Sequence, residues 1–133
     1  QRDLLTKEAT ALKYKRIDIA ALGSGPVAID SIEWFASPAD IANLLNNIRR
    51  TGNQTALDLM AVNKGVSPVS AVKWQYLGYK GGSEPGVASM SYLGQSKAGD
   101  WYVISGSWNN PAKEVDINTF SALMGRLVDS QMK

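Results

Sequence analysis

The hydrophobic pattern of this chain changes its period near Ser70, and that change limits the folds that the chain can adopt. Before it, apolar residues recur every three or four positions, which is the spacing of amphipathic helices. After it, Val72, Trp74 and Tyr76 alternate with polar residues, which is the spacing of a strand. A helical pattern returns only near the C-terminus. Helices first, then strands, then a closing helix are typical of an α+β domain.

The clearest helix is predicted over residues 38–51. Ser37 is suited to cap its N-terminus, and Asp40 completes a capping-box pattern. The apolar stripe that follows consists of Ile41, Leu44, Leu45 and Ile48. Gly52 is suited to end the helix. A shorter second helix is predicted over residues 54–62.

Three strands and a final helix complete the prediction. The strands are expected at about 71–82, 87–93 and 101–108, and the helix at about 116–131. Large apolar side chains occur on both faces of the strands, so we expect helices on both sides of the sheet. The chain is therefore expected to be α+β, with a three-stranded antiparallel sheet in a single domain, residues 1–133.

Composition excludes several kinds of chemistry. The 133 residues include no Cys and no His, which excludes thiol catalysis, disulfides, a Ser-His-Asp triad and the usual zinc or haem sites. We therefore expect no metal and no cofactor. The net charge of +2, with scattered basic residues, argues against nucleic acid as a partner. No apolar run reaches the roughly 20 residues that a membrane span needs. Because the sequence begins with Gln1, we expect a mature or truncated polypeptide.

The strongest candidate site lies at Lys80, Gly81, Gly82 and Ser83, where the first strand is expected to end. A cation followed by two residues without a Cβ lets a carboxylate or an oxyanion approach the main chain closely. The simpler alternatives are a solvated surface lysine and a glycine turn or bulge. Glu84 could act as a general base, although Glu-Pro-Gly is first of all a turn sequence.

Two segments carry a family resemblance: residues 32–38, with the sequence Ile-Glu-Trp-Phe-Ala-Ser-Pro, and residues 80–87, with the sequence Lys-Gly-Gly-Ser-Glu-Pro-Gly-Val. Together with the order of elements from about Val27 to Lys133, they resemble the C-terminal half of a class A β-lactamase-like serine hydrolase. Penicillin-binding proteins share this scheme. The resemblance implies a bacterial protein that is periplasmic or secreted.

The resemblance also assigns roles to the candidate site. Lys80 matches the motif lysine, which contacts the substrate carboxylate, and Gly82 matches the motif glycine. Ser83 follows where the family supplies a backbone N–H to the oxyanion hole. Gly81 departs from the pattern, because the family has a hydroxyl residue there. The implied substrate of the full-length parent is a small-molecule or peptide-like acyl compound.

The family's nucleophile motif has no convincing match. The family carries Ser-x-x-Lys on a helix in its N-terminal half. Ser70-Ala71-Val72-Lys73 is expected at the start of a strand, where side chains three residues apart point to opposite faces. Ser130-Gln131-Met132-Lys133 lies at the C-terminal end, where helices fray. We therefore expect no catalytic residue in this chain, which would be a partial domain without its catalytic half, inert alone.

A second hypothesis remains open, namely a stand-alone binding or assembly module that keeps the scaffold without the chemistry. A Ser-x-x-Lys helix and a Ser-Asp-Asn loop encoded before Gln1 would favour the hydrolase, whereas a native start near Gln1 would favour the module. In the family, the strand matching Trp101–Trp108 pairs with N-terminal strands. The resemblance therefore implies an open edge there and a homodimer formed through it.

Overall fold

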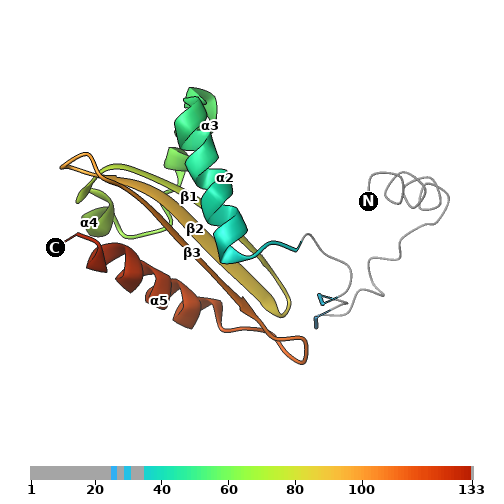
Figure 1. Cartoon of the computed structure of the whole chain (residues 1–133). Helices are drawn as coiled ribbons and strands as arrows, with labels where there is room; N and C mark the ends of the chain where they lie inside the picture. The colour runs from blue at the N-terminus through green and yellow to red at the C-terminus, as the bar shows by residue number, and fades with distance from the viewer. Residues whose placement is uncertain (1–24, 27–28, 31–34, 133) are drawn as a thin grey trace, which may run out of the picture.

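The computed structural model describes residues 25–26, 29–30 and 35–132, which form a three-stranded sheet between helices (Figure 1). The helices are α2 (Pro38–Thr51), α3 (Gln54–Val62), α4 (Pro68–Ala71) and α5 (Ile117–Ser130). The strands are β1 (Trp74–Glu84), β2 (Val87–Ser96) and β3 (Trp101–Asn109). The predicted α+β fold is confirmed.

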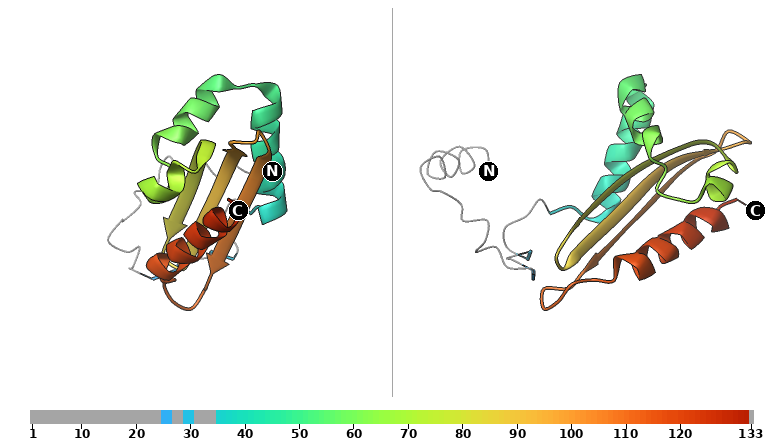
Figure 2. Two further views of the ribbon diagram at one scale, coloured as in Figure 1. Left: turned by 90° about the vertical axis from the view of Figure 1, so that its left-hand side faces the viewer. Right: turned by 180° about the vertical axis from the view of Figure 1, so that it is seen from behind.

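The sheet is antiparallel, with strand order β1–β2–β3. α5 packs on one face, across β2 and β3, while α2 and α3 pack on the opposite face (Figure 1, Figure 2). On that second face α3 contacts mainly β1, and α2 contacts mainly β3. The expectation that both faces are covered is confirmed.

α2 begins and ends where its capping residues indicate. The Asp40 N–H donates to Ser37 Oγ at 3.2 Å, and the Ser37 N–H donates to Asp40 Oδ2 at 2.8 Å, which closes a capping box. Gly52 has a left-handed φ of 64° and its N–H donates to the Arg49 carbonyl. The Ser37 hydroxyl also donates to Asp40 Oδ2 at 2.7 Å, and this hydrogen bond, followed by that from the Ser37 N–H, lowers the pKa of Asp40 below 3.8, because both favour the ionised carboxylate.

The main core lies between α5 and the sheet. Phe120, Met124 and Val128 are spaced four residues apart and are all buried. They pack against the side chains of β1 and β2 on the same face: Trp74, Leu77, Ala88, Met90 and Tyr92. α5 starts at an Asp116 cap, whose Oδ1 accepts from the N–H groups of Asn118 and Thr119.

The observed bounds differ from the predicted ones mainly around the first strand. β1 begins at Trp74 rather than near residue 71, because residues 68–71 form α4, a helical turn capped by Ser67. β1 also continues to Glu84, and Pro85–Gly86 form the turn to β2. β2 continues to Ser96 rather than ending at about residue 93, so four residues connect it to β3.

Two further expectations from the sequence, the family-like segment at residues 32–38 and the lack of a membrane span, can be compared with the structure only over the described residues. Residues 32–34 of the 32–38 segment that resembles the hydrolase family lie outside the described residues, whereas residues 35–38 lead into and begin α2. Within the part of the chain that the structure describes, no helix has the length and apolar character to cross a membrane.

Candidate functional site

The four candidate residues lie inside β1 and not beyond its end. Lys80 pairs with Ser91, Gly81 with Met90, Gly82 with Ser89, and Ser83 with Ala88. The first strand was expected to end at about residue 82, within this segment, but it continues to Glu84, and the hairpin turn comes at Pro85–Gly86. β1 is the outermost strand, however, and no described strand pairs with its other side. In an antiparallel ladder alternate residues direct their N–H and C=O groups outward, so two of these four residues do so.

Lys80 and Gly82 lie on the face of the sheet that carries α2 and α3. Two contacts of residues at the same parity along β1 establish this orientation. Tyr76 Oη donates to the Leu57 carbonyl of α3 at 2.8 Å. A Cβ on Gly78 would stand 2.9 Å from the Met60 Cβ of the same helix. Side chains alternate between faces along a strand, so Lys80 points to this side as well.

The two glycines of the motif have opposite surroundings. A Cβ on Gly81 would collide with the Tyr79 hydroxyl, whereas a Cβ on Gly82 would meet nothing within 4 Å. The Tyr79 ring is held against the Tyr92 ring, with centroids 5.1 Å apart. Gly82 therefore provides the open backbone that the sequence indicated, while Gly81 makes room for Tyr79.

The Lys80 ammonium group is exposed and donates to the Gly81 carbonyl. In this position it folds back over its own strand and stands beside the glycine pair. An exposed cation next to accessible main chain can attract a carboxylate or another anion, because the ammonium group is a compact charge with three donors.

Four serines extend the candidate site across the sheet, and the sequence analysis missed them. Ser91 and Ser105 lie in line with Lys80, and Ser89 and Ser107 lie in line with Gly82. We call these four residues the serine rows. The Ser91 and Ser105 hydroxyl groups are 2.9 Å apart. Their signal in the sequence is alternation, since each serine stands between two residues that face α5 and that are apolar, aromatic or glycine.

A pocket of about 190 Å³ lies at one end of the serine rows. Ser89, Ser105 and Ser107 line it from the sheet, and Pro38 and Ile41 line it from the start of α2. Lys80 does not line this pocket. The lysine and the pocket therefore share one face of the sheet but form two separate places.

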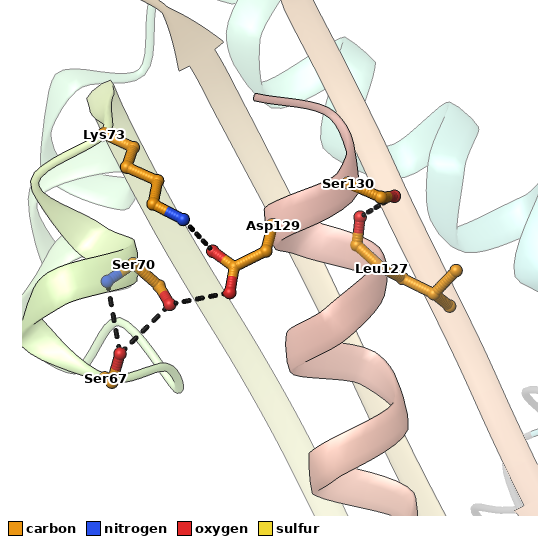
Figure 3. Close-up of polar contacts among 6 residues, drawn as sticks. All are labelled: Ser67, Ser70, Lys73, Leu127, Asp129 and Ser130. Atoms are coloured by element: carbon orange, nitrogen blue, oxygen red, sulfur yellow. Dashed lines mark hydrogen bonds and ion pairs between the residues drawn. The ribbon is translucent and has the colours of Figure 1, made fainter. Parts of the chain in front are cut away.

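The geometry expected for Ser70 and Lys73 is wrong. Ser70 lies in the α4 turn rather than in a strand, so both side chains reach the same carboxylate, that of Asp129 in α5 (Figure 3). Ser70 Oγ donates to Asp129 Oδ2 at 3.1 Å, and Lys73 Nζ donates to Oδ1 at 3.1 Å. The Ser67 and Ser70 hydroxyl groups are 3.0 Å apart.

This Ser70–Lys73–Asp129 cluster joins α4 and the start of β1 to α5. The hydrogen bond from Lys73, with a smaller contribution from Ser70, lowers the pKa of Asp129, although partial burial opposes this shift. A carboxylate with a lowered pKa is a weaker base, and Ser70 is only 8% exposed. The cluster therefore favours a structural role for Ser70 over that of a nucleophile.

The second Ser-x-x-Lys match is not assembled within the described residues. Ser130 is the last residue of α5, and its hydroxyl donates to the Leu127 carbonyl at 2.8 Å (Figure 3). Lys133 lies outside the described residues. Residues 25–26, 29–30 and 35–132 contain no group of three acidic side chains placed to hold a metal ion.

Comparisons with known proteins add no assignment to this geometry. Neither the models of known protein families nor the curated proteins gave a match to the chain.

Proposed function

We propose that this chain is the C-terminal part of a β-lactamase-like serine hydrolase, and that Lys80, Gly81, Gly82 and Ser83 form one wall of its active site. The reaction of the parent protein would be acyl transfer. A serine outside this chain attacks an amide, lactam or ester carbonyl, and water then releases the acyl group. The chain alone would be inert, because the nucleophile belongs to the missing half.

The observation that carries this proposal is the position of the glycine pair on an outermost strand. The space at Gly82 is open, and no described strand covers the outer side of β1. An acyl substrate can therefore lie along this strand and accept hydrogen bonds from its main chain. An oxyanion that develops during acyl transfer needs such fixed N–H donors, since fixed donors require no reorganisation during the reaction.

Within the proposed site, each residue has a distinct part. Lys80 supplies positive charge that attracts a substrate carboxylate and stabilises negative charge near the attacking oxygen. The Ser83 N–H is the proposed donor to the oxyanion. Gly81, which must stay small beside Tyr79, offers no hydroxyl group to the substrate carboxylate. A substrate without penicillin-type carboxylate recognition is therefore favoured.

The decisive experiment is intact-mass analysis of two proteins after exposure to an acylating β-lactam and to an activated-serine probe. One is this chain, and the other is the protein encoded when the upstream sequence is included. We expect no adduct on the chain alone and one stoichiometric adduct on a Ser-x-x-Lys serine of the longer protein. An adduct on Ser70 or Ser130, or an upstream sequence without such a motif, would refute the proposal.

The alternative function is a non-catalytic binding or assembly module on the same scaffold. No described strand pairs with the outer edge of β3, which favours this alternative, because an unpaired strand is a ready surface for another chain. A native start near Gln1, with full solubility and no serine reactivity, would support this alternative. The hydrolase proposal also predicts export to the periplasm or the medium. Secretion of a reporter fused to the upstream sequence would test that prediction.

A further inference from the structure

We propose that the pocket between the β2–β3 hairpin and the end of α5 binds a small carboxylate that carries an aromatic ring. The pocket has a volume of about 440 Å³, within the usual range of about 300–1,000 Å³ for small-molecule sites. Its lining includes Lys73 before β1, Lys97 and Asp100 of the hairpin, Tyr102 of β3, and Met132 after α5. These parts lie at the same end of the sheet (Figure 1, Figure 2). None of them belongs to the proposed hydrolase site, so this inference does not rest on the proposed function.

The hairpin wall of the pocket is held by its own hydrogen bonds. The Ser96 N–H donates to the Asp100 carbonyl at 2.8 Å, and the Asp100 N–H donates back to Ser96 Oγ at 3.1 Å. The Gly99 N–H donates to the Ser96 carbonyl at 2.9 Å, and Gly99 has a left-handed φ of 97°. Lys97 and Asp100 are exposed at this turn. The backbone that carries these two charged side chains is therefore already ordered, which lowers the cost of arranging them around a ligand.

A second wall of the pocket is fixed by the Ser70–Lys73–Asp129 cluster. Lys73 Nζ donates to Asp129 Oδ1 at 3.1 Å, which ties the start of β1 to the last turn of α5. The Met132 N–H donates to the Asp129 carbonyl at 3.1 Å, so the residues after α5 stay close to the same turn. An ammonium group has three N–H donors, and this ion pair uses one of them. Lys73 can therefore donate to a ligand while it keeps its contact with Asp129.

The apolar part of the lining rests on the main core. Tyr102 is partly buried, and its ring meets the Trp74 ring edge-on, with centroids 5.7 Å apart and planes at 83°. Met132 is partly buried as well and packs against the same core cluster. An aromatic ring of a ligand can stack on a tyrosine, and a thioether contacts ring edges favourably. This part of the pocket therefore suits a ring rather than a bare ion.

The buried indole N–H of Trp74 also favours a ligand that brings a hydrogen-bond acceptor. Trp74 is 5% exposed, and among the described residues its Nε1 is the one buried side-chain nitrogen or oxygen without a hydrogen-bond partner. The Cε3 and Cζ3 edge of the indole lies against Gly94, so the N–H edge points away from the sheet on the α5 side. The pocket lies on this side, beside the Tyr102 ring that Trp74 contacts. Buried N–H groups without an acceptor are rare in native proteins.

The charges around the pocket favour a single carboxylate over an anion with several charges. Lys73 and Lys97 supply positive charge from two separate walls. Asp100 adds a carboxylate on the hairpin, and Asp129 neutralises part of the charge of Lys73. One negative charge can lie near the two lysines, whereas a dianion would meet stronger repulsion from Asp100. Together with the apolar lining, this charge pattern selects an aromatic carboxylate.

A nuclear magnetic resonance titration of the isotope-labelled full chain with benzoate tests the site and its location. We expect saturable shifts of the Lys97, Gly99 and Tyr102 amide signals. The dissociation constant should be about 1 mM or below, because a ligand of this size binds modestly. Acetate has the charge without the ring, and inorganic phosphate has more charge without the ring. Each should bind at least about tenfold more weakly than benzoate.

Two charge reversals that give the same net charge separate the pocket from general electrostatic attraction. Lys97→Glu should raise the dissociation constant for benzoate at least about tenfold, because it puts a second carboxylate on the hairpin with Asp100. Lys113→Glu is the matched control, in the loop between β3 and α5 at the other end of the sheet, and should bind benzoate like the original chain. Both lysines are exposed, so both variants should fold, and the dispersion of their amide signals checks this.

The proposal is supported if benzoate shifts the pocket signals, acetate and phosphate bind more weakly, and only Lys97→Glu weakens binding. Shifts that do not saturate, or that centre on Lys80, overturn it. Equal affinity of the two variants for benzoate overturns it as well, because the pocket lysine would then have no special part. Phosphate that binds as tightly as benzoate overturns the ligand class. None of these outcomes alters the serine-adduct test, so the two proposals can fail separately.

Discussion

The two outer edges of the sheet, formed by β1 and β3, are suited to different ligands: a small molecule at β1 and another strand at β3. The β1 edge carries Lys80 and Glu84, two adjacent glycines, and an irregular register between Trp74 and Tyr76. The β3 edge carries no charge, and most of its residues are half-buried although no described strand pairs with it. Charged side chains on an outermost strand disfavour its pairing with another sheet, and the main chain of β1 stays accessible to a small ligand. β3 is suited to a whole strand.

Two strands that both lie at an outer edge of the sheet can therefore favour different kinds of partner. No described strand pairs with the outer side of either β1 or β3, and β3 contacts α5, whose Leu123 and Leu127 are exposed, while its own Trp108 is 38% exposed. A protein surface with so much adjacent apolar area usually marks a contact with another chain. We therefore expect substitutions at the two edges to have different consequences.

The largest effect is expected where α5 holds β3. Met124 is 2% exposed, and its sulfur lies against Gly106 of β3. Met124→Ala should lower the free energy of unfolding by about 2–5 kcal/mol, because it leaves a cavity in the main core. Urea denaturation followed by tryptophan fluorescence measures this change. Leu123→Ala, on the exposed side of the same helix, should cost less than about 1 kcal/mol. Equal losses would show that α5 is not anchored as described.

The second effect distinguishes the two glycines of the β1 edge. Gly81→Ala should lower stability by about 1–3 kcal/mol, because the new methyl group displaces the Tyr79 ring from its place against Tyr92. Gly82→Ala should stay within about 0.5 kcal/mol, since open space surrounds it. Thermal unfolding of the two variants side by side measures the difference. A tolerated Gly81→Ala would mean that Tyr79 moves freely.

A smaller effect is expected at the Ser70–Lys73–Asp129 cluster, which ties the start of β1 to α5. Asp129→Asn should cost no more than about 1 kcal/mol, since the Lys73 and Asp129 side chains are 42% and 40% exposed and solvent screens the pair. Because folding lowers the pKa of Asp129 below 3.8, its contribution is present above pH 3.8 and is lost as pH falls through the folded-state pKa.

Acid titration of the urea midpoint measures the contribution of Asp129. The variant should lose less stability than the original chain between about pH 5 and pH 2, while both keep the slopes that come from Asp40 and Asp116, whose pKa values are also lowered. Identical acid profiles would show that the carboxylate contributes nothing to folding.

The smallest effect on stability is expected at Lys80. Its side chain is exposed, so Lys80→Met should change the free energy of unfolding by less than about 0.5 kcal/mol. In the longer protein that the hydrolase proposal requires, the same substitution should slow acylation by about a hundredfold, because charge stabilisation is lost. A stable variant that acylates at the original rate would remove Lys80 from the proposed site.

Local patterns predicted the elements well where capping and periodicity agreed. The bounds of α2 follow from Ser37, Asp40 and Gly52, and those of α3 match the predicted 54–62. The first strand was placed too early, because Val72 fits the alternation of β1 although it belongs to the turn after α4. The α4 helix has four residues, which is too short for a periodic hydrophobic pattern in the sequence. It is recognised only in the structure, where it contacts α5.

The candidate site was predicted in part for a similar reason. Lys80 and the glycine pair are neighbours in the sequence, so they lie close together whatever fold the chain adopts. The serine rows come from two strands whose register decides which residues meet, and Ser91 and Ser105 are 14 positions apart. The shared contact of Ser70 and Lys73 with Asp129 likewise joins residues more than 50 positions apart.

The sequence by itself determined the α+β class, the capped helices, the absence of thiol and imidazole chemistry, and the pairing of a cation with glycine backbone. Only the tertiary structure decided that these residues lie within an outermost strand, that Gly81 and Gly82 differ, and that β3 keeps an uncharged edge beside the leucines of α5. The physical reason is that caps and periodicity act over one or two turns of chain. Strand order, register and helix placement depend on contacts between residues far apart in the sequence.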